Sequence, residues 1–123
     1  VHSRIKQMLS FENLNVYQDS LKLALDIYKF SKKFPREELF GLTSQIRRAV
    51  VSISLNIAEG SSRSKKDFRH FLDISRGSCY ELVPLLKICL ELKYITPKEF
   101  EEIYPRVDNL AKRINALKNS VKP

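Results

Sequence analysis

The amino-acid sequence predicts an all-α protein, folded as an antiparallel up-down-up-down four-helix bundle. Only three of its 123 residues are glycine, and leucine, isoleucine, lysine and glutamate are abundant, which favours long helices with few turns. Four segments show the apolar spacing of helices, and the short connections between them favour antiparallel neighbours. A three-helix arrangement with a loose first helix is the alternative. The length corresponds to one domain.

Residues 1–13 show no clear periodicity and are expected to form a mobile N-terminal arm, which leaves residues 14–121 as a single four-helix-bundle domain. The first helix should run from Leu14 to Phe34, with Asn13 as its N-cap and the following proline at its end. Its apolar residues cover an arc of about 200°, which is wider than a helix of a monomeric bundle needs. This surplus predicts that copies of the chain associate. The apolar residues are Leu14, Tyr17, Leu21, Ala24 and Tyr28 on one flank and Val16, Leu23, Ile27, Phe30 and Phe34 on the next.

The second helix is expected from Leu42 to Ala58 or Glu59, with Gly60 as its C-terminal cap. A polar line with apolar margins follows this helix beside the core. It consists of Gln45, Arg48, Ser52, Asn56 and Glu59. Because an unpaired buried polar group costs roughly 1–3 kcal/mol, we expect this line to form a buried, hydrogen-bonded network. A ligand site is the alternative.

The third helix should begin after Ser64, a good N-cap with an acidic residue three positions on, and run to about Tyr94. Small residues in its middle would let another helix approach closely: Ser75, Gly77, Ser78 and Cys79. Cys79 and Cys89 lie ten residues apart on this helix, about 15 Å, which is too far for a disulfide. They are expected to be buried free thiols of a cytoplasmic protein.

The fourth helix should start with Thr96 as N-cap, Pro97 at the first position and Glu99 completing a capping box. Its apolar seam alternates steps of three and four residues: Phe100, Ile103, Val107, Leu110, Ile114, Leu117 and Val121. Pro84 and Pro105 fall inside the third and fourth helices, where each removes a backbone hydrogen bond. We expect kinks at these two positions and not breaks.

The sequence offers no pattern typical of an enzyme. It contains no glycine-rich phosphate loop, no HExxH, no CxxC and no GxSxG, and its two histidines, His2 and His70, are far apart. We therefore expect no catalytic residue, no metal and no cofactor. There is no run of about 18 apolar residues and no signal-peptide core, so neither membrane insertion nor secretion is expected.

Two stretches of sequence carry a family resemblance. FPREELFGLTSQIRRAVVSISLNIAEGSSR, followed by DFRHFLDISRGSCYEL, resembles the four-helix-bundle family of 23S rRNA intervening-sequence proteins, which also includes accessory variability proteins of diversity-generating retroelements. The SI-x-x-NIAEG core is its most specific part. The resemblance implies a homo-oligomer, commonly a pentameric ring, with no known enzymatic activity. For the retroelement branch it implies nucleic-acid binding beside a reverse transcriptase.

The excess positive charge is concentrated at one expected end of the bundle. The chain carries 22 basic and 14 acidic residues, a net charge of +8, which favours anionic partners. Antiparallel helices would bring residues 1–13, 57–70 and 111–123 to one end of the bundle, where they contribute ten basic and three acidic side chains. Residues 30–43 and 88–103, at the opposite end, contribute five basic and six acidic side chains.

This basic pole predicts binding of RNA or DNA. The candidate contacts are Arg63, Lys65, Lys66, Arg69, Lys118 and Lys122. Lys65 and Lys66 fall in the first turn of the third helix, where the helix dipole disfavours cations, so an anion would explain their position. A merely solvated basic end is the alternative, and a purely structural or protein-interaction bundle is the alternative function.

Overall fold

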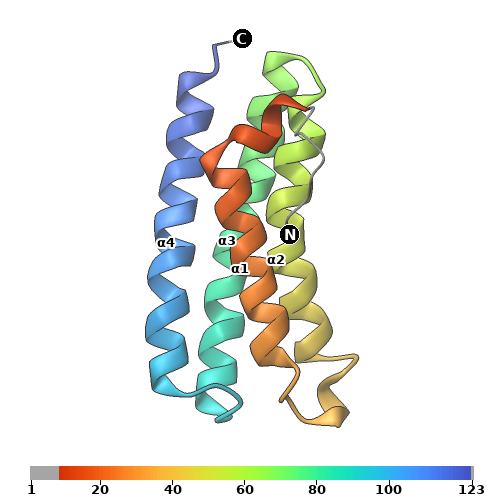
Figure 1. Cartoon of the computed structure of the whole chain (residues 1–123), viewed down its shortest axis with the longest axis vertical. Helices are drawn as coiled ribbons and strands as arrows, with labels where there is room; N and C mark the ends of the chain where they lie inside the picture. The colour runs from red at the N-terminus through yellow and green to blue at the C-terminus, as the bar shows by residue number, and fades with distance from the viewer. Residues whose placement is uncertain (1–8, 123) are drawn as a thin grey trace, which may run out of the picture.

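The computed structural model describes residues 9–122. Over these residues it contains four α-helices, two short 3-10 helices and no strand (Figure 1). The elements are η1 (Ser10–Asn13), α1 (Asn15–Ser31), η2 (Arg36–Glu38), α2 (Leu42–Ser61), α3 (Lys65–Glu91) and α4 (Pro97–Ser120). The predicted all-α fold with four helices is therefore confirmed.

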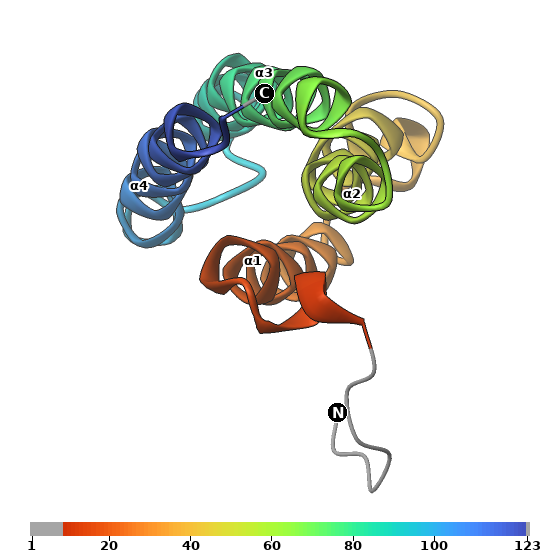
Figure 2. The ribbon, with the colours of Figure 1, turned by 90° about the horizontal axis from the view of Figure 1, so that it is seen from above.

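The helices lie side by side along one long axis. The α1–α2 and α3–α4 connections lie at one end, and the α2–α3 connection lies at the other end with the C-terminus (Figure 1). Seen along the axis, the helices follow one another around a ring, with α4 beside α1 (Figure 2). The contact between α2 and α3 is the most extensive, and that between α1 and α4 is the slightest.

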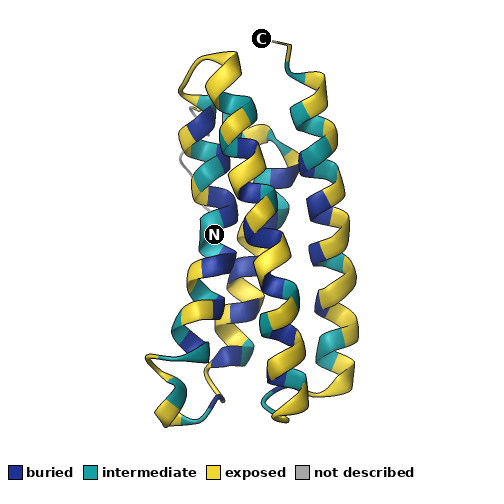
Figure 3. Ribbon diagram, turned by 180° about the vertical axis from the view of Figure 1, so that it is seen from behind, coloured by how far each residue is buried: buried dark blue, intermediate teal, exposed yellow. Residues whose placement is uncertain are grey.

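The core is formed by the inward faces of all four helices, as the colouring by burial shows (Figure 3). Its largest fully buried side chains recur at helical spacing: Leu23 and Ile27 on α1, Ile46, Val50, Ile53 and Ile57 on α2, Leu72, Leu82 and Leu86 on α3, and Val107, Leu110 and Ile114 on α4. The predicted α4 seam is confirmed at Ile103, Val107, Leu110 and Ile114, which are all buried. Removing such side chains from water is the main favourable term in folding.

The beginning of α1 differs from the prediction. Its N-cap is Leu14, and Asn13 instead ends the 3-10 helix η1. The carbonyl oxygen of Glu12 accepts a 2.9 Å hydrogen bond from the Gln18 side chain, which ties η1 to α1 without a side-chain cap. Most of the expected N-terminal arm, residues 1–8, lies outside the described residues.

The end of α1 also differs, because the helix stops at Ser31 and not at Phe34. The Phe34 amide donates to the Ser31 carbonyl in a tight turn, since the residue before a proline disfavours helical geometry. This turn buries the Phe34 ring 5.5 Å from that of Tyr94.

Gly60 lies inside α2 and is not the cap that the sequence predicts. The helix continues to Ser61, with Ser62 as its C-cap. A Cβ at Gly60 would lie 2.5 Å from the Cβ of Phe71 on α3, closer than real side chains allow. The glycine is therefore required because the two helices approach each other closely here.

The two predicted N-caps are confirmed. The Ser64 hydroxyl accepts the Asp67 amide at the start of α3, and Thr96 and Glu99 form the full capping box of α4, with Pro97 in its first turn. The prediction for the end of α3 is wrong, because the helix stops at Glu91 and the chain turns through Lys93, whose φ of 63° is left-handed. Both α3 and α4 continue through their internal prolines.

Three ion pairs join α1 and the turn after it to α4. The paired residues on α1 and the turn after it are seven positions apart. Their partners on α4 are also seven positions apart, in the opposite direction along the chain. The pairs are Asp19–Arg113, Asp26–Arg106 and Lys33–Glu99.

Gly60→Ala is expected to lower the free energy of unfolding by about 1–3 kcal/mol, because the added methyl group would overlap Phe71. Gly77→Ala is the matched control on α3. Nothing lies within 4 Å of a Cβ at that position, so better helix propensity should raise the stability by about 0.5–1 kcal/mol. Urea unfolding of both variants measures these changes. Equal effects would contradict the close approach assigned to Gly60.

Glu99→Gln is expected to make stability less dependent on pH. Partial burial alone would raise the pKa of Glu99, but hydrogen bonds from Lys33 and from the Thr96 amide lower it below its ordinary 4.5. The ionised carboxylate therefore stabilises the folded state above that pH, and this contribution is lost as the pH falls through the lowered pKa. The pair is partly exposed, so its worth is at most about 1 kcal/mol. Thermal unfolding from pH 7 to 3 should show the two proteins converging, and a constant difference would refute this.

Candidate nucleic-acid interface and polar groove

Three lysines of the predicted basic pole are exposed. Lys65 and Lys66 occupy the first turn of α3, and Lys122 follows α4 at the same end of the bundle (Figure 1). Within residues 9–122 none of the three forms a hydrogen bond or ion pair. Their ammonium groups are therefore available to a partner.

The other three predicted contacts are engaged within the protein. Arg69 donates from Nη1 to the carbonyl oxygens of Lys118 (2.8 Å) and Val121 (2.9 Å), which closes the C-terminal end of α4. The ammonium group of Lys118 pairs with Asp73 on α3 at 2.9 Å. These contacts join α3 to α4 and were not visible in the sequence, because the partners lie 45 or more positions apart.

Arg63 has a local partner. Its guanidinium pairs with Glu59 one turn earlier at 2.7 Å and lies 5.3 Å from the centre of the Phe71 ring. Glu59 therefore belongs to the basic pole and not to the polar network that the sequence predicts.

The charge of the pole is smaller than sequence counting predicts. The part of the pole within the described residues, 9–13, 57–70 and 111–122, contains eight basic and three acidic side chains. Three of the basic ones, Lys112, Arg113 and Lys118, pair with aspartates further along the bundle. Counting these aspartates reduces the excess from +5 to +2, which resides mainly near the α2–α3 connection.

The predicted polar line divides into separate groups. The Asn56 amide donates to the Ser52 carbonyl (2.8 Å) and hydroxyl (2.9 Å), and the Ser78 hydroxyl of α3 donates to the Ser52 hydroxyl at 2.9 Å. Ser78 was not among the predicted network residues, and its only signal was its place in the small middle of the third helix. The cluster links α2 to α3 through side chains alone.

Gln45 and Arg48 are exposed, whereas the sequence predicts that they are buried. They lie along an open groove of about 590 Å³ between α2 and α3, together with Glu81, Pro84 and Leu85. Neither side chain forms a hydrogen bond with another described residue. The difference arises because no other helix covers this edge of α2.

The cysteines are buried free thiols, as predicted. Burial raises the pKa of Cys79 to about 12, and burial together with the nearby charge of Glu38 raises that of Cys89 to about 11. Since the thiolate is the reactive form, both are poor nucleophiles. The described residues contain no group of three or more histidine, cysteine, aspartate or glutamate side chains placed to hold a metal. No described helix has a long enough apolar stretch to cross a membrane.

Comparison with known families matches residues 12–116 to the 23S rRNA-intervening sequence protein family. The chain belongs to this family. Among solved structures, it is similar to the crystal structure of a protein of unknown function from the S23 ribosomal protein family of Bacteroides thetaiotaomicron. The two are 27% identical with a TM-score of 0.78, over 85% of this chain and 96% of the other. No curated protein matches. The predicted family resemblance is confirmed, and the relation to retroelement proteins stays a prediction.

In this family member, Asn56→Leu is expected to lower the free energy of unfolding by about 1 kcal/mol, because Ser52 loses the amide that bonds to it. Gln45→Leu on the same polar line is the matched control. It introduces the same residue into the same helix, but the side chain that it replaces forms no hydrogen bond with another described residue. It should change stability by less than about 0.5 kcal/mol. Chemical unfolding measures both variants, and an undiminished stability of Asn56→Leu would mean that the amide is simply solvated.

Proposed function

We propose that this protein is a non-enzymatic, homo-oligomeric bundle that binds RNA or DNA through its basic pole. The observation that carries the proposal is the position of Lys65 and Lys66 in the first turn of α3. Cations there are unfavourable by roughly 0.3–1 kcal/mol each, so helix stability does not account for them. An anion docked at this end of α3 would account for the two lysines.

The phosphate backbone of a nucleic acid has the chemistry that this end of the bundle can recognise. Amides at the beginning of α3, the positive end of its dipole and exposed ammonium groups converge on one place. Lys122 adds a further cation at the same end. Such contacts position a nucleic acid without reading its sequence, so binding should be general and strongly dependent on salt.

Self-association is supported by apolar side chains that the bundle leaves uncovered. Leu21, Leu25 and Tyr28 of α1 are 40%, 66% and 40% exposed, and Leu55 of α2 is 61% exposed. The wide apolar arc of the first helix thus extends beyond the core, which favours burial against another copy. A pentameric ring, which the family resemblance implies, would repeat the basic pole around its axis.

A protein-interaction bundle is the second candidate, for example an accessory subunit of a reverse transcriptase. The same exposed apolar residues favour it, because a partner of another kind could cover them equally well. The absence of nucleic-acid binding in the titration below would favour this candidate. For either function the buried, reduced cysteines support a cytoplasmic location.

Lys65→Glu combined with Lys66→Glu is expected to weaken RNA and DNA binding at least tenfold and to reduce the slope of log affinity against log salt by about 1.5, since two phosphate contacts are lost. The matched control is Lys93→Glu with Lys98→Glu, which makes the same change of net charge at the opposite end. Fluorescence anisotropy with labelled single-stranded RNA and duplex DNA at two salt concentrations measures both. If the two double variants bind alike, the basic pole is not the binding surface.

A further inference from the structure

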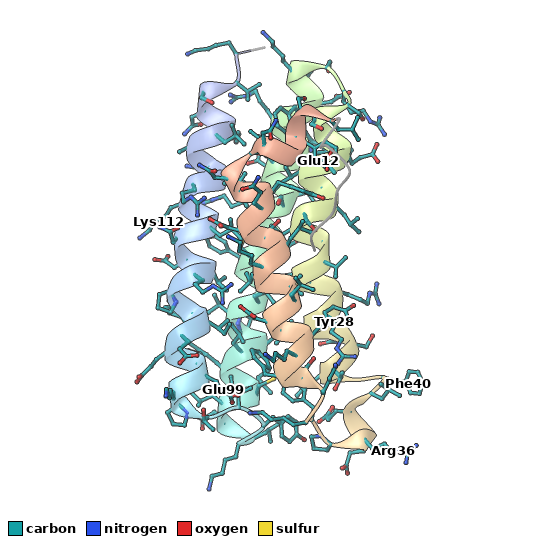
Figure 4. The ribbon with its side chains drawn as sticks, viewed as in Figure 1. Glu12, Tyr28, Arg36, Phe40, Glu99 and Lys112 are labelled. Atoms are coloured by element: carbon teal, nitrogen blue, oxygen red, sulfur yellow. The ribbon has the colours of Figure 1, made fainter. Side chains whose placement is uncertain are left out.

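Arg69 of α3 is bonded to the chain at the point where α4 ends. Its Nη1 atom donates to the carbonyl oxygens of Lys118 at 2.8 Å and of Val121 at 2.9 Å. The last turns of α4, which follow Lys112, run to this end of the bundle (Figure 4). One side chain of α3 therefore holds the chain as it leaves α4.

This contact fixes the peptide group that joins Val121 to Lys122. The Val121 amide donates to the Lys118 carbonyl at 3.1 Å, and the Val121 side chain packs against the core. Because a peptide group is planar, the hydrogen bond that Arg69 donates to the Val121 carbonyl also sets the direction of the Lys122 amide and Cα. Arg69 therefore limits where the Lys122 side chain can lie.

Arg69 belongs to a row of α3 that faces α4. Lys65, Arg69 and Asp73 are spaced by four residues, so their side chains follow one another along the helix. Asp73 also contacts α4, because it pairs with Lys118 at 2.9 Å. Lys65 is the next member of the row toward the end of the bundle, and Lys122 follows the segment that Arg69 holds. The two exposed lysines therefore lie at the same end of the α3–α4 contact.

The acidic side chains at this end do not neutralise Lys65 and Lys122. Asp67, in the first turn of α3, lies two positions, or about 200°, around the helix from Lys65 and so projects from another face. Like charges at neighbouring positions repel each other, so an anion between the two lysines would be stabilised by both. The other acidic residues at this end have partners: Glu12 with the Leu9 amide, Glu59 with Arg63, and Asp73 with Lys118.

Arg69 also offsets the negative end of the α4 dipole. Carbonyl groups without partners in the helix give the C-terminal end of a helix about half a negative charge. Left uncovered, these carbonyls would repel a phosphate that approached Lys122. Arg69 places a positive charge and a shared hydrogen-bond donor at this point. The end of α4 thereby becomes compatible with a bound phosphate.

We infer that Arg69 is a positioning residue of a two-helix phosphate site, in which Lys65 of α3 and Lys122 after α4 are the contacts. The inference rests on the proposed function, because it concerns the same basic pole. It adds that the end of α4 is part of the site. The Nη1 atom of Arg69 is committed to two carbonyl oxygens, so its effect on binding passes through Lys122.

The test compares Arg69→Met, Lys122→Ala and the double variant, with Arg113→Met as the matched control. Arg113→Met makes the same substitution and also breaks an interhelical contact, the ion pair with Asp19, but leaves the end of α4 intact. Fluorescence anisotropy with labelled duplex DNA and single-stranded RNA at two salt concentrations measures the slope of log affinity against log salt.

Arg69→Met and Lys122→Ala should each reduce this slope by about 0.7–0.9 for each pole that contacts the nucleic acid, which corresponds to one phosphate contact. The double variant should lose no more than either single variant, and Arg113→Met should keep the wild-type slope. Arg69→Gln, which removes the charge and withdraws the donor from the α4 carbonyls, is measured in parallel and should behave as Arg69→Met does. Circular dichroism and urea unfolding establish that each variant is folded in the titration buffer.

Three outcomes overturn the inference and leave nucleic-acid binding standing. In the first, the Arg69 variants bind like Arg113→Met, and in the second, Lys122→Ala binds like the wild type. In the third, the two losses add in the double variant, which would make Arg69 a phosphate contact in its own right. A wild-type protein that binds neither nucleic acid removes the proposed binding function together with this inference.

Discussion

Small residues bring α2 and α3 into close contact, and this contact positions the other features of the bundle. Gly60 makes room for Phe71, and the buried Ser75 hydroxyl donates to the Ile53 carbonyl at 2.8 Å. Neither arrangement is compatible with a larger side chain, because a bulkier residue would separate the helices. Lys65 in the first turn of α3 and the polar groove along α2 both lie on the pair of helices fixed in this way.

The attachment of α1 to α4 is of a different kind. Ion pairs at seven-residue spacing join α1 and the turn after it to α4, and these two helices have the least contact of any neighbouring pair in the bundle. Each pair is partly exposed, so each contributes at most about 1 kcal/mol, and the main effect of the ladder is on register. Shifting α1 by a turn would separate every acid from its base, and reversing it would place Asp19 opposite Glu99 and Lys33 opposite Arg113, so that like charges meet.

Only part of the candidate site follows from counting charges. Lys65 and Lys66 are exposed as predicted, but Arg69 caps the carbonyls at the end of α4 and Lys118 pairs with Asp73. Basic residues on a helical bundle can hold two helices together or contact an anionic partner, and their sequence pattern is the same in either case. The structure separates them because a structural arginine has a partner on another helix, while a free lysine has only solvent.

The sequence by itself determined the four helices, their core faces and the caps at Ser64 and Thr96, because these depend on residues three or four positions apart. Its longer motifs indicated the family. Tertiary packing alone decided that Gly60 is a contact and not a cap, that Ser78 completes the bond network of Ser52, and which polar residues of α2 stay exposed. The physical reason is distance along the chain. A cap is satisfied within its own turn, whereas a glycine or hydroxyl between helices has a role only once the other helix has packed against it.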